Sequence, residues 1–265
     1  MISNLAKLLR YRGLIQSLVA RELKARYRGS VLGFFWSFIN PLLLLLVYSF
    51  VFAVVLPNRS PDLQPYALFM FCGILPWTWF SASILESANV LISGGNLIKK
   101  VLFPAEVLPI VTVLANLVHF LFGLPILVIF LLVYQHPPDL LDLLWFPVVL
   151  VVQLVLTLGL ALIVSALTVH FRDIKDILSN LMTFWFFATP IIYPMSQMKD
   201  WPQAKTLLNL NPFTHLAISY QELLFYPGPF GHWRWLLALG VASIGVFACG
   251  YFLFDRLRDS FAEEV

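Results

Sequence analysis

The sequence predicts an all-α membrane protein that crosses a bilayer six times, and two observations support this fold class. Six long apolar stretches alternate with short polar segments, and each approaches or exceeds the roughly 20 residues that a helix needs to cross about 30 Å of hydrocarbon. Because hydrocarbon offers no water to backbone groups, such stretches have to be helices. In addition, 60% of the 265 residues are hydrophobic and only 12% are charged, whereas soluble domains contain roughly 25% charged residues. The predicted spans are residues 34–56, 66–85, 107–134, 144–169, 177–193 and 233–254.

The distribution of basic residues predicts the orientation of these spans. Seven Lys and Arg residues precede the first span, and two more lie in each of the segments 86–104, 170–176 and 255–265. These segments share one side of a six-span protein, so that side holds 13 of the 17 basic residues. The positive-inside rule therefore places both termini in the cytoplasm. Since the spans occupy most of the chain, we expect a single transmembrane domain over residues 1–265.

Residues 3–23 predict an amphipathic helix. Leucine, isoleucine and valine recur there at spacings of three, four and seven, and basic residues occupy much of the remainder. A helix of this kind is suited to lie along the cytoplasmic surface of the membrane. The pattern fits a topology anchor and a partner-docking element equally well. Gly29 and Gly33 then interrupt it and allow a turn into the bilayer.

The first span carries a kink signal and a stripe of aromatic residues. Pro41 removes a backbone donor and clashes with the carbonyl of Ser37, which predicts a kink. The flat faces of aromatic side chains at helical spacing are able to contact sugar rings in a conduit. Lipid contact and packing against a neighbouring helix are commoner causes of such a stripe, and both stay open. The aromatic stripe comprises Phe34, Phe38, Tyr48 and Phe52.

Two long polar connections lie on opposite sides of the predicted membrane. The cytoplasmic segment 86–104 exceeds the few residues needed to join adjacent helices, and it fits either a partner-docking element or a solvated hairpin tip. The segment 194–232 would stay outside. Its apolar pieces, 207–210 and 213–225, are too short to span and predict two short helices at the outer interface.

The sequence lacks the residues that most membrane chemistry requires. No span has Asp, Glu, Lys or Arg near its centre, although ion-coupled carriers generally need ionisable groups at membrane depth. Asn116, His119, Gln153 and Asn180 are the notable polar residues of the spans, and we expect them to bridge helices. There is no G-x-x-x-x-G-K-[ST] loop for a nucleotide, no cluster at metal-ligand spacing and no convincing nucleophile–base pair. We therefore expect no metal, cofactor or catalytic residue in this chain, and no nucleic-acid partner, because the basic amino-terminal segment adjoins a span.

Five short motifs follow one another along the chain. They are RELKARYRGS at 21–30 with Leu32, Gly33 and Trp36, NLIKK at 96–100 with Phe103 and Pro104, FRD at 171–173, TPIIYP at 189–194, and Asn211 with Pro212. Together they resemble the membrane subunits of type-2 ABC exporters, most closely those that export lipid-linked polysaccharides such as O-antigen, capsule or teichoic acid. Each motif alone is weak, and the specificity comes from five in family order on a matching topology. Ala105 and Gln221 depart from the family pattern, which has a basic residue at both positions.

The resemblance implies roles for three sets of residues. A coupling segment would contact an ATP-hydrolysing partner, with the amphipathic helix beside it, and Arg172 and Asp173 would form a second contact. Spans one and five would face the conduit. The implied coupling residues are Leu91, Asn96, Leu97, Ile98, Lys99 and Lys100, and the implied conduit residues are Phe34, Phe38, Tyr48, Phe52, Phe184 and Phe187.

The resemblance also implies an assembly and a substrate. Two copies of this chain and two ATPase chains would form the exporter in the bacterial cytoplasmic membrane, with ATP and Mg²⁺ bound only by the ATPase. The favoured substrate is an undecaprenyl-linked, O-antigen-type polysaccharide. The alternatives are a permease of the same superfamily for capsule, teichoic acid, lipid or drug, an ion-coupled carrier, and a membrane-embedded enzyme acting on lipid-linked sugars. Against an enzyme, Glu86, Glu106 and Glu222 form no evident catalytic set.

Overall fold

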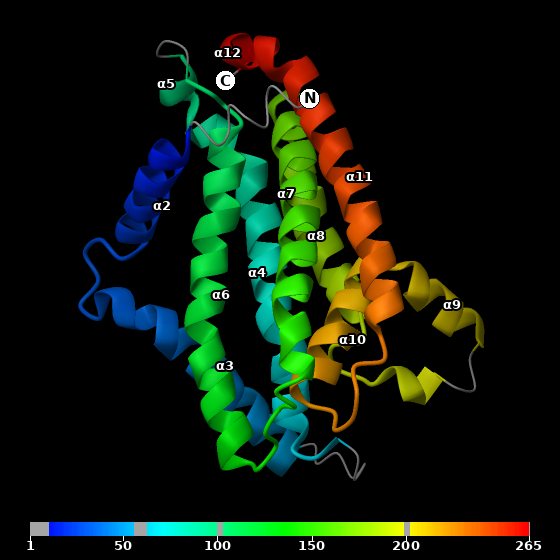
Figure 1. The fold of residues 1–265 in the computed structure, drawn as a ribbon. Coiled ribbons are helices and arrows are strands. Elements are labelled where there is room, and N and C mark those ends of the chain that lie inside the picture. The colour runs from blue at the N-terminus through cyan, green and yellow to red at the C-terminus, as the bar shows by residue number, and fades with distance from the viewer. Residues whose placement is uncertain (1–10, 56–62, 100–102, 199–201, 265) are drawn as a thin grey trace.

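The computed structural model describes residues 11–55, 63–99, 103–198 and 202–264, and its regular elements within these ranges are all helices. Figure 1 shows the long helices side by side in one bundle, with α5 and α12 together at one end. In chain order the elements are α2 (Arg12–Arg26), η1 (Gly33–Phe35), α3 (Trp36–Phe50), η2 (Val51–Val55), α4 (Tyr66–Ser93), α5 (Gly95–Ile98), α6 (Val107–Val133), η4 (Asp142–Trp145), α7 (Phe146–His170), α8 (Ile174–Phe187), η5 (Met195–Met198), α9 (Pro202–Leu210), α10 (Pro212–Leu224), α11 (Trp233–Leu257), η6 (Arg258–Ser260) and α12 (Phe261–Glu264).

Five helical segments in the described ranges are long and apolar enough to cross a membrane. They confirm the all-α membrane fold class and correspond to five of the six predicted spans. Their ends differ from the predicted ones because hydropathy marks the embedded part of a helix, whereas the helix continues until its backbone is interrupted. Thus α4 extends beyond residue 85 to Ser93, where Gly94 follows. The five segments are Gly33–Phe50, Tyr66–Ser93, Val107–Val133, Asp142–His170 and Trp233–Ser260.

The segment predicted as the fifth span, residues 177–193, is not one continuous helix. Helix α8 has 14 residues and ends at Phe187, so it is roughly 21 Å long, less than the roughly 30 Å of a hydrocarbon core. The predicted end at 193 was wrong for a physical reason that lies in the sequence. Pro190 has no backbone N–H and disfavours helical geometry at Thr189, and turns and bends follow as far as Tyr193.

The short helices lie against the bundle to different degrees. In the described part of the amino-terminal helix, Leu18 of α2 packs against Val107 and Val111 of α6; residues 3–10 of the predicted helix lie outside the described residues. Residues 207–210 belong to α9 and residues 213–224 to α10, and the position of these helices at an outer interface stays a prediction. Most of α10 is buried, so it is part of the core, while α9 is largely exposed.

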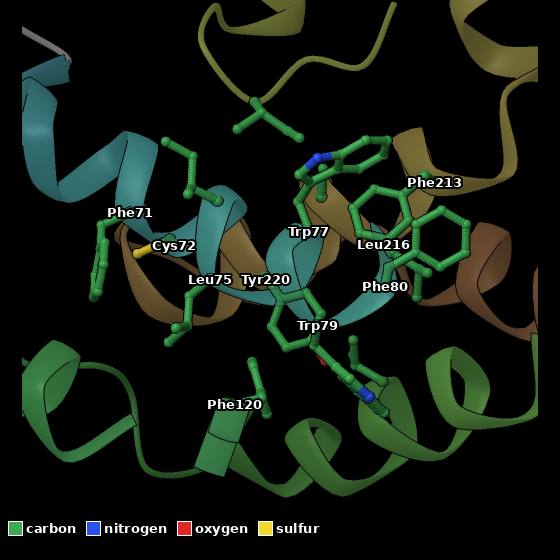
Figure 2. Packing of buried hydrophobic residues seen from close by; sticks show 14 of the residues in the cluster. Phe71, Cys72, Leu75, Trp77, Trp79, Phe80, Phe120, Phe213, Leu216 and Tyr220 are labelled. Carbon is green, nitrogen blue, oxygen red and sulfur yellow. The ribbon is translucent and has the colours of Figure 1, made fainter. Parts of the chain in front are cut away.

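Helix α4 forms the centre of the core. Figure 2 shows its side chains pointing in two directions, with Trp77 and Phe80 toward Phe213 of α10 and Trp79 toward Phe120 of α6. The Trp77 and Phe213 rings meet edge to face with centroids 4.9 Å apart, a favoured geometry for aromatic pairs. Helix α4 therefore packs against neighbours on both sides, with α6 and α7 as well as α10 in contact with it.

Helices α7 and α11 approach each other closely at two glycines. A Cβ added to Gly250 of α11 would lie 2.4 Å from the carbonyl oxygen of Gly159 on α7, and one added to Gly159 would lie 2.7 Å from the Phe247 backbone. Small residues allow such approaches between membrane helices. These two glycines therefore fix the α7–α11 pair, which anchors the last predicted span to the bundle.

Candidate functional site

A polar cluster joins α2, α4 and α6. Arg26, the last residue of α2, forms an ion pair with Glu86 of α4 and donates from Nη1 to Asn116 Oδ1 of α6 at 2.9 Å. Asn116 donates in turn from Nδ2 to Glu86 Oε2 at 2.8 Å. The Glu86 carboxylate thus accepts hydrogen bonds from two other helices, and charge-assisted bonds of this kind are stronger than neutral ones.

A second set of hydrogen bonds fixes the beginning of α3 beside this cluster. The Tyr27 hydroxyl lies 2.6 Å from Ser37 Oγ and 3.1 Å from Nδ1 of His119 on α6. Asn116 and His119 are three residues apart on α6, so both lie on the face that α2 and α3 cover. The other ring nitrogen of His119, Nε2, is buried and has no partner among the described residues.

These groups line a cavity of about 460 Å³ between α2, α3, α4 and α6, which we call the inner cavity. Ligand sites typically measure roughly 300–1,000 Å³. The wall combines the polar side chains just described with the rings of Trp36, Trp79 and Phe120. Such a lining suits a ligand that has both hydrogen-bonding groups and apolar faces.

Three of the four polar residues predicted to bridge helices do so. Asn116 and His119 act as described, and Gln153 of α7 donates to the Pro76 carbonyl of α4 at 2.9 Å. Asn180 was wrongly assigned, because it donates to the Asp176 carbonyl of its own helix at 3.2 Å and is exposed. The ion pair between Arg26 and Glu86 was not predicted. From the sequence, Arg26 was interpreted as a signal of membrane orientation and Glu86 as marking the end of a span.

The aromatic stripe of the first span lies partly against the bundle. Phe34 and Phe38 pack against Phe122 of α6, with ring centroids 4.7 and 5.2 Å away, and Tyr48 packs against the main core. Within one copy of the chain these contacts correspond to the helix-packing alternative. The Phe52 side chain lies outside the described part of the structure, and the conduit role of the stripe stays a prediction.

Helix α8 is exposed on most of its surface. Leu178 and Met182 are its buried residues, whereas the conduit candidates Phe184 and Phe187 are 71% and 58% exposed. The exposed surface also carries polar side chains, among them Asn180 and Thr183. Residues 176, 180, 183 and 187 share one helical face, and hydrocarbon is a poor environment for the polar ones.

The predicted coupling residues divide into a buried anchor and an exposed tip. Leu91 is 1% exposed and packs in a cluster with Leu108 of α6 and Phe261 of α12. Leu97 and Ile98 pack on the edge of that cluster, and Asn96 and Lys99 are exposed. Lys100 lies outside the described residues.

The second predicted contact lies at the turn between α7 and α8. Arg172 and Asp173 are both exposed there. His170, the last residue of α7, contacts the Phe261 ring of α12, and α12 contacts α5. The structure therefore brings both predicted contact segments to the same end of the bundle (Figure 1).

The described residues include no group of three or more side chains that would hold a metal ion. A protein-family model described as ABC-2 type transporter matches residues 13–225. The chain is 43% identical to the O-antigen export system permease protein RfbA of Myxococcus xanthus, over the full length of both. It is 32% identical to the protein of the same name from Klebsiella pneumoniae over 94% of each chain, and 23% identical to the polysialic acid transport protein KpsM of Escherichia coli over 81% of each.

Proposed function

This chain belongs to the ABC-2 type transporter family, and we propose that it is the membrane permease subunit of an ATP-driven exporter for an undecaprenyl-linked, O-antigen-type polysaccharide. The observation that carries the proposal is the full-length identity of 43% with an O-antigen export permease. The identity with the polysialic acid transporter is lower, which makes capsule export the second candidate. In both cases the substrate is a polysaccharide.

The proposed arrangement places both termini in the cytoplasm of a bacterium and gives the chain six crossings. Five crossings are the long helices, and α8 together with the segments around it supplies the sixth. Support comes from the asymmetric distribution of basic residues, which the positive-inside rule converts into an orientation. Exposed polar residues on α8 support a crossing that faces water or a second copy instead of lipid. Two copies of the chain would then enclose the conduit between their α8 and α3 helices.

Coupling to ATP hydrolysis would pass through the end of the bundle that carries α5. The exposed residues Asn96 and Lys99 form a tip that a partner ATPase is able to contact, and Arg172 and Asp173 lie at the same end. Leu91 anchors that tip to α6 and α12. Because α5 follows α4 directly, closure of the ATPase dimer would move α4, which is the central helix of the core, and open the path for the glycan.

Glu86 and Glu222 do not form a catalytic pair of carboxylates. Glu86 is engaged with Arg26 and Asn116, and Glu222 accepts hydrogen bonds from the backbone of the turn before α11. A pair of carboxylates that shared a substrate would have to lie within one site, and these two line different cavities.

The experiment that tests the proposal is purification of the tagged chain from its native membranes in mild detergent, with partners identified by mass spectrometry. We expect an ATPase in stoichiometric amounts. The double substitution Lys99→Glu and Lys100→Glu should reduce its recovery, and the single substitution Lys99→Glu should reduce it to a smaller extent. Lys205→Glu, which is the same single charge reversal on the exposed face of α9, should not. A homogeneous complex that lacks an ATPase, yet still supports glycan export, would overturn the proposal.

A further inference from the structure

Two adjoining cavities lie at the end of the bundle opposite α5 and α12. The larger has a volume of about 530 Å³ and the smaller about 370 Å³. The turn that follows α10 separates them, since Tyr226, Pro227 and Gly228 line both; Figure 1 shows this turn at the lower end of the bundle. We call the larger one the outer cavity, and its wall includes Met195, Ser196, Gln197, Ile218, Glu222 and Tyr226.

The outer cavity offers polar groups that the described residues leave uncommitted. The side chains of Ser196 and Gln197 are exposed and make no hydrogen bond to any described residue. Glu222 uses one oxygen, Oε2, to accept from the backbone amides of Gly231 and His232, both at 3.0 Å. Its Oε1 has no hydrogen-bond partner among the described residues. A hydroxyl, a carboxamide and a carboxylate oxygen provide both donors and acceptors.

The same wall offers an apolar surface. Ile218 and Met195 line it together with the ring of Tyr226. That ring is held in place by Phe69 and Phe225, with centroids 5.9 and 5.4 Å away. A pyranose has hydroxyls around its edge and C–H groups on its faces, so polar groups beside a fixed aromatic ring match both parts of a sugar.

The charge of this region selects against anions. Of the described residues that line the two cavities, none is Lys or Arg, whereas Asp139, Asp142 and Glu222 are acidic. Burial raises the pKa of Glu222, and the neighbouring Asp142 acts in the same direction; this favours the neutral carboxyl of Glu222 and leaves the repulsion of an anion to Asp139 and Asp142 of the adjoining smaller cavity. A phosphate or an acidic sugar would meet like charge here, while a neutral sugar would meet hydrogen-bonding groups.

We propose that the outer cavity is a saccharide subsite, which binds a short neutral segment of the glycan on the side where it leaves the membrane. Ser196, Gln197 and Glu222 hydrogen-bond the sugar hydroxyls, and Tyr226 contacts a sugar face. The inference rests on the proposed export function, and it adds a position and a charge preference for the substrate. By holding a segment that has already crossed, the subsite would oppose backward slippage between ATP cycles.

The test is saturation-transfer NMR on the purified complex in nanodiscs, with neutral trisaccharides of mannose, rhamnose, glucose and galactose and an acidic trisaccharide of sialic acid. We expect a signal from at least one neutral trisaccharide and none from the acidic one. Ser196→Trp and Gln197→Trp, which fill the cavity, should weaken binding about tenfold or more, and Gln197→Ala by less, because it removes only one hydrogen-bonding group. Gln203→Ala on α9 is the matched control and should bind as the wild type does.

The subsite is overturned if no neutral trisaccharide binds, if the acidic one binds more tightly, or if both tryptophan variants bind normally. A parallel measurement of surface glycan separates this failure from failure of the export function. Deletion of the chain without loss of surface glycan would refute export itself. Loss on deletion, combined with unaltered trisaccharide binding by the tryptophan variants, would refute the subsite alone.

Discussion

Substitution of Glu86 by Gln tests whether the polar cluster of α2, α4 and α6 holds the bundle together. Glutamine keeps the size of the side chain but removes the charge that Arg26 and Asn116 bind. A hydrogen bond to a charged group contributes about 1.5–3 kcal/mol. The Arg26 and Glu86 side chains are 24% and 40% exposed, and solvent screening lowers that contribution. We therefore expect Glu86→Gln to reduce the free energy of unfolding by about 1–2 kcal/mol.

The chain offers a matched control for this substitution. Glu22 also faces Arg26, at 3.6 Å and one helical turn away, and its side chain is 46% exposed. Pairs of this kind on one helix are worth about 0.3–0.5 kcal/mol. Glu22→Gln should therefore have a much smaller effect, although it removes the same charge from the same arginine.

The assay is a reversible unfolding titration in mixed micelles, with Asn116→Ala added to complete a double-mutant cycle. Because Asn116 bonds both members of the ion pair, we expect its effect to be strongly non-additive with that of Glu86→Gln. Equal losses for the Glu22 and Glu86 variants, or additive effects of Glu86→Gln and Asn116→Ala, would refute the view that the three side chains act as one cluster.

Three further outcomes follow from the contacts already described. Gly250→Ala should destabilise the protein by about 1–3 kcal/mol. Gly245→Ala on the same helix should be nearly neutral, because its new Cβ would meet nothing within 4 Å. Equal effects of the two substitutions on thermal unfolding would contradict the close α7–α11 contact. Burial, with the adjacent His215, lowers the pKa of His232 from 6.5 to about 4, so between these two pH values the unfolded chain binds more protons than the folded one. The stability present above pH 6.5 should therefore fall as the pH is lowered from 6.5 toward 4. His232→Gln should flatten this dependence of the melting temperature on pH. Asn211→Ala removes the side chain that caps α10 at Phe213 N and accepts a hydrogen bond from Trp185 Nε1. It should lower the free energy of unfolding by about 2–4 kcal/mol in the same titration. A smaller decrease than that of Gly245→Ala would contradict the role of Asn211 in joining α8 to α10.

The sequence alone identified the class of this protein, because hydropathy reports directly which solvent a segment prefers. The long apolar stretches marked five helices that the structure contains, and Asn116, His119 and Gln153 were expected to bridge helices because an unpaired polar group is costly in hydrocarbon. Five motifs in order indicated the exporter family that the comparisons then showed. These features depend on composition and on residues near one another in the chain.

The tertiary structure decided which residues meet, since pairing depends on the rotation and relative depth of helices that hydropathy does not encode. Arg26 and Glu86 are far apart in the sequence, and only the packing of both α2 and α4 against α6 brings them together. Length predicted only that residues 213–225 form a short helix at or dipping into the outer interface, whereas the tertiary structure decided that α10 is buried within the protein, because α4 and α11 cover its faces. The end of α8 was misjudged since apolar character continued past Pro190, where the backbone is unable to continue the helix. The composition of each segment thus indicates whether that segment prefers water or hydrocarbon, whereas cavities and ion pairs form only where several helices pack against each other.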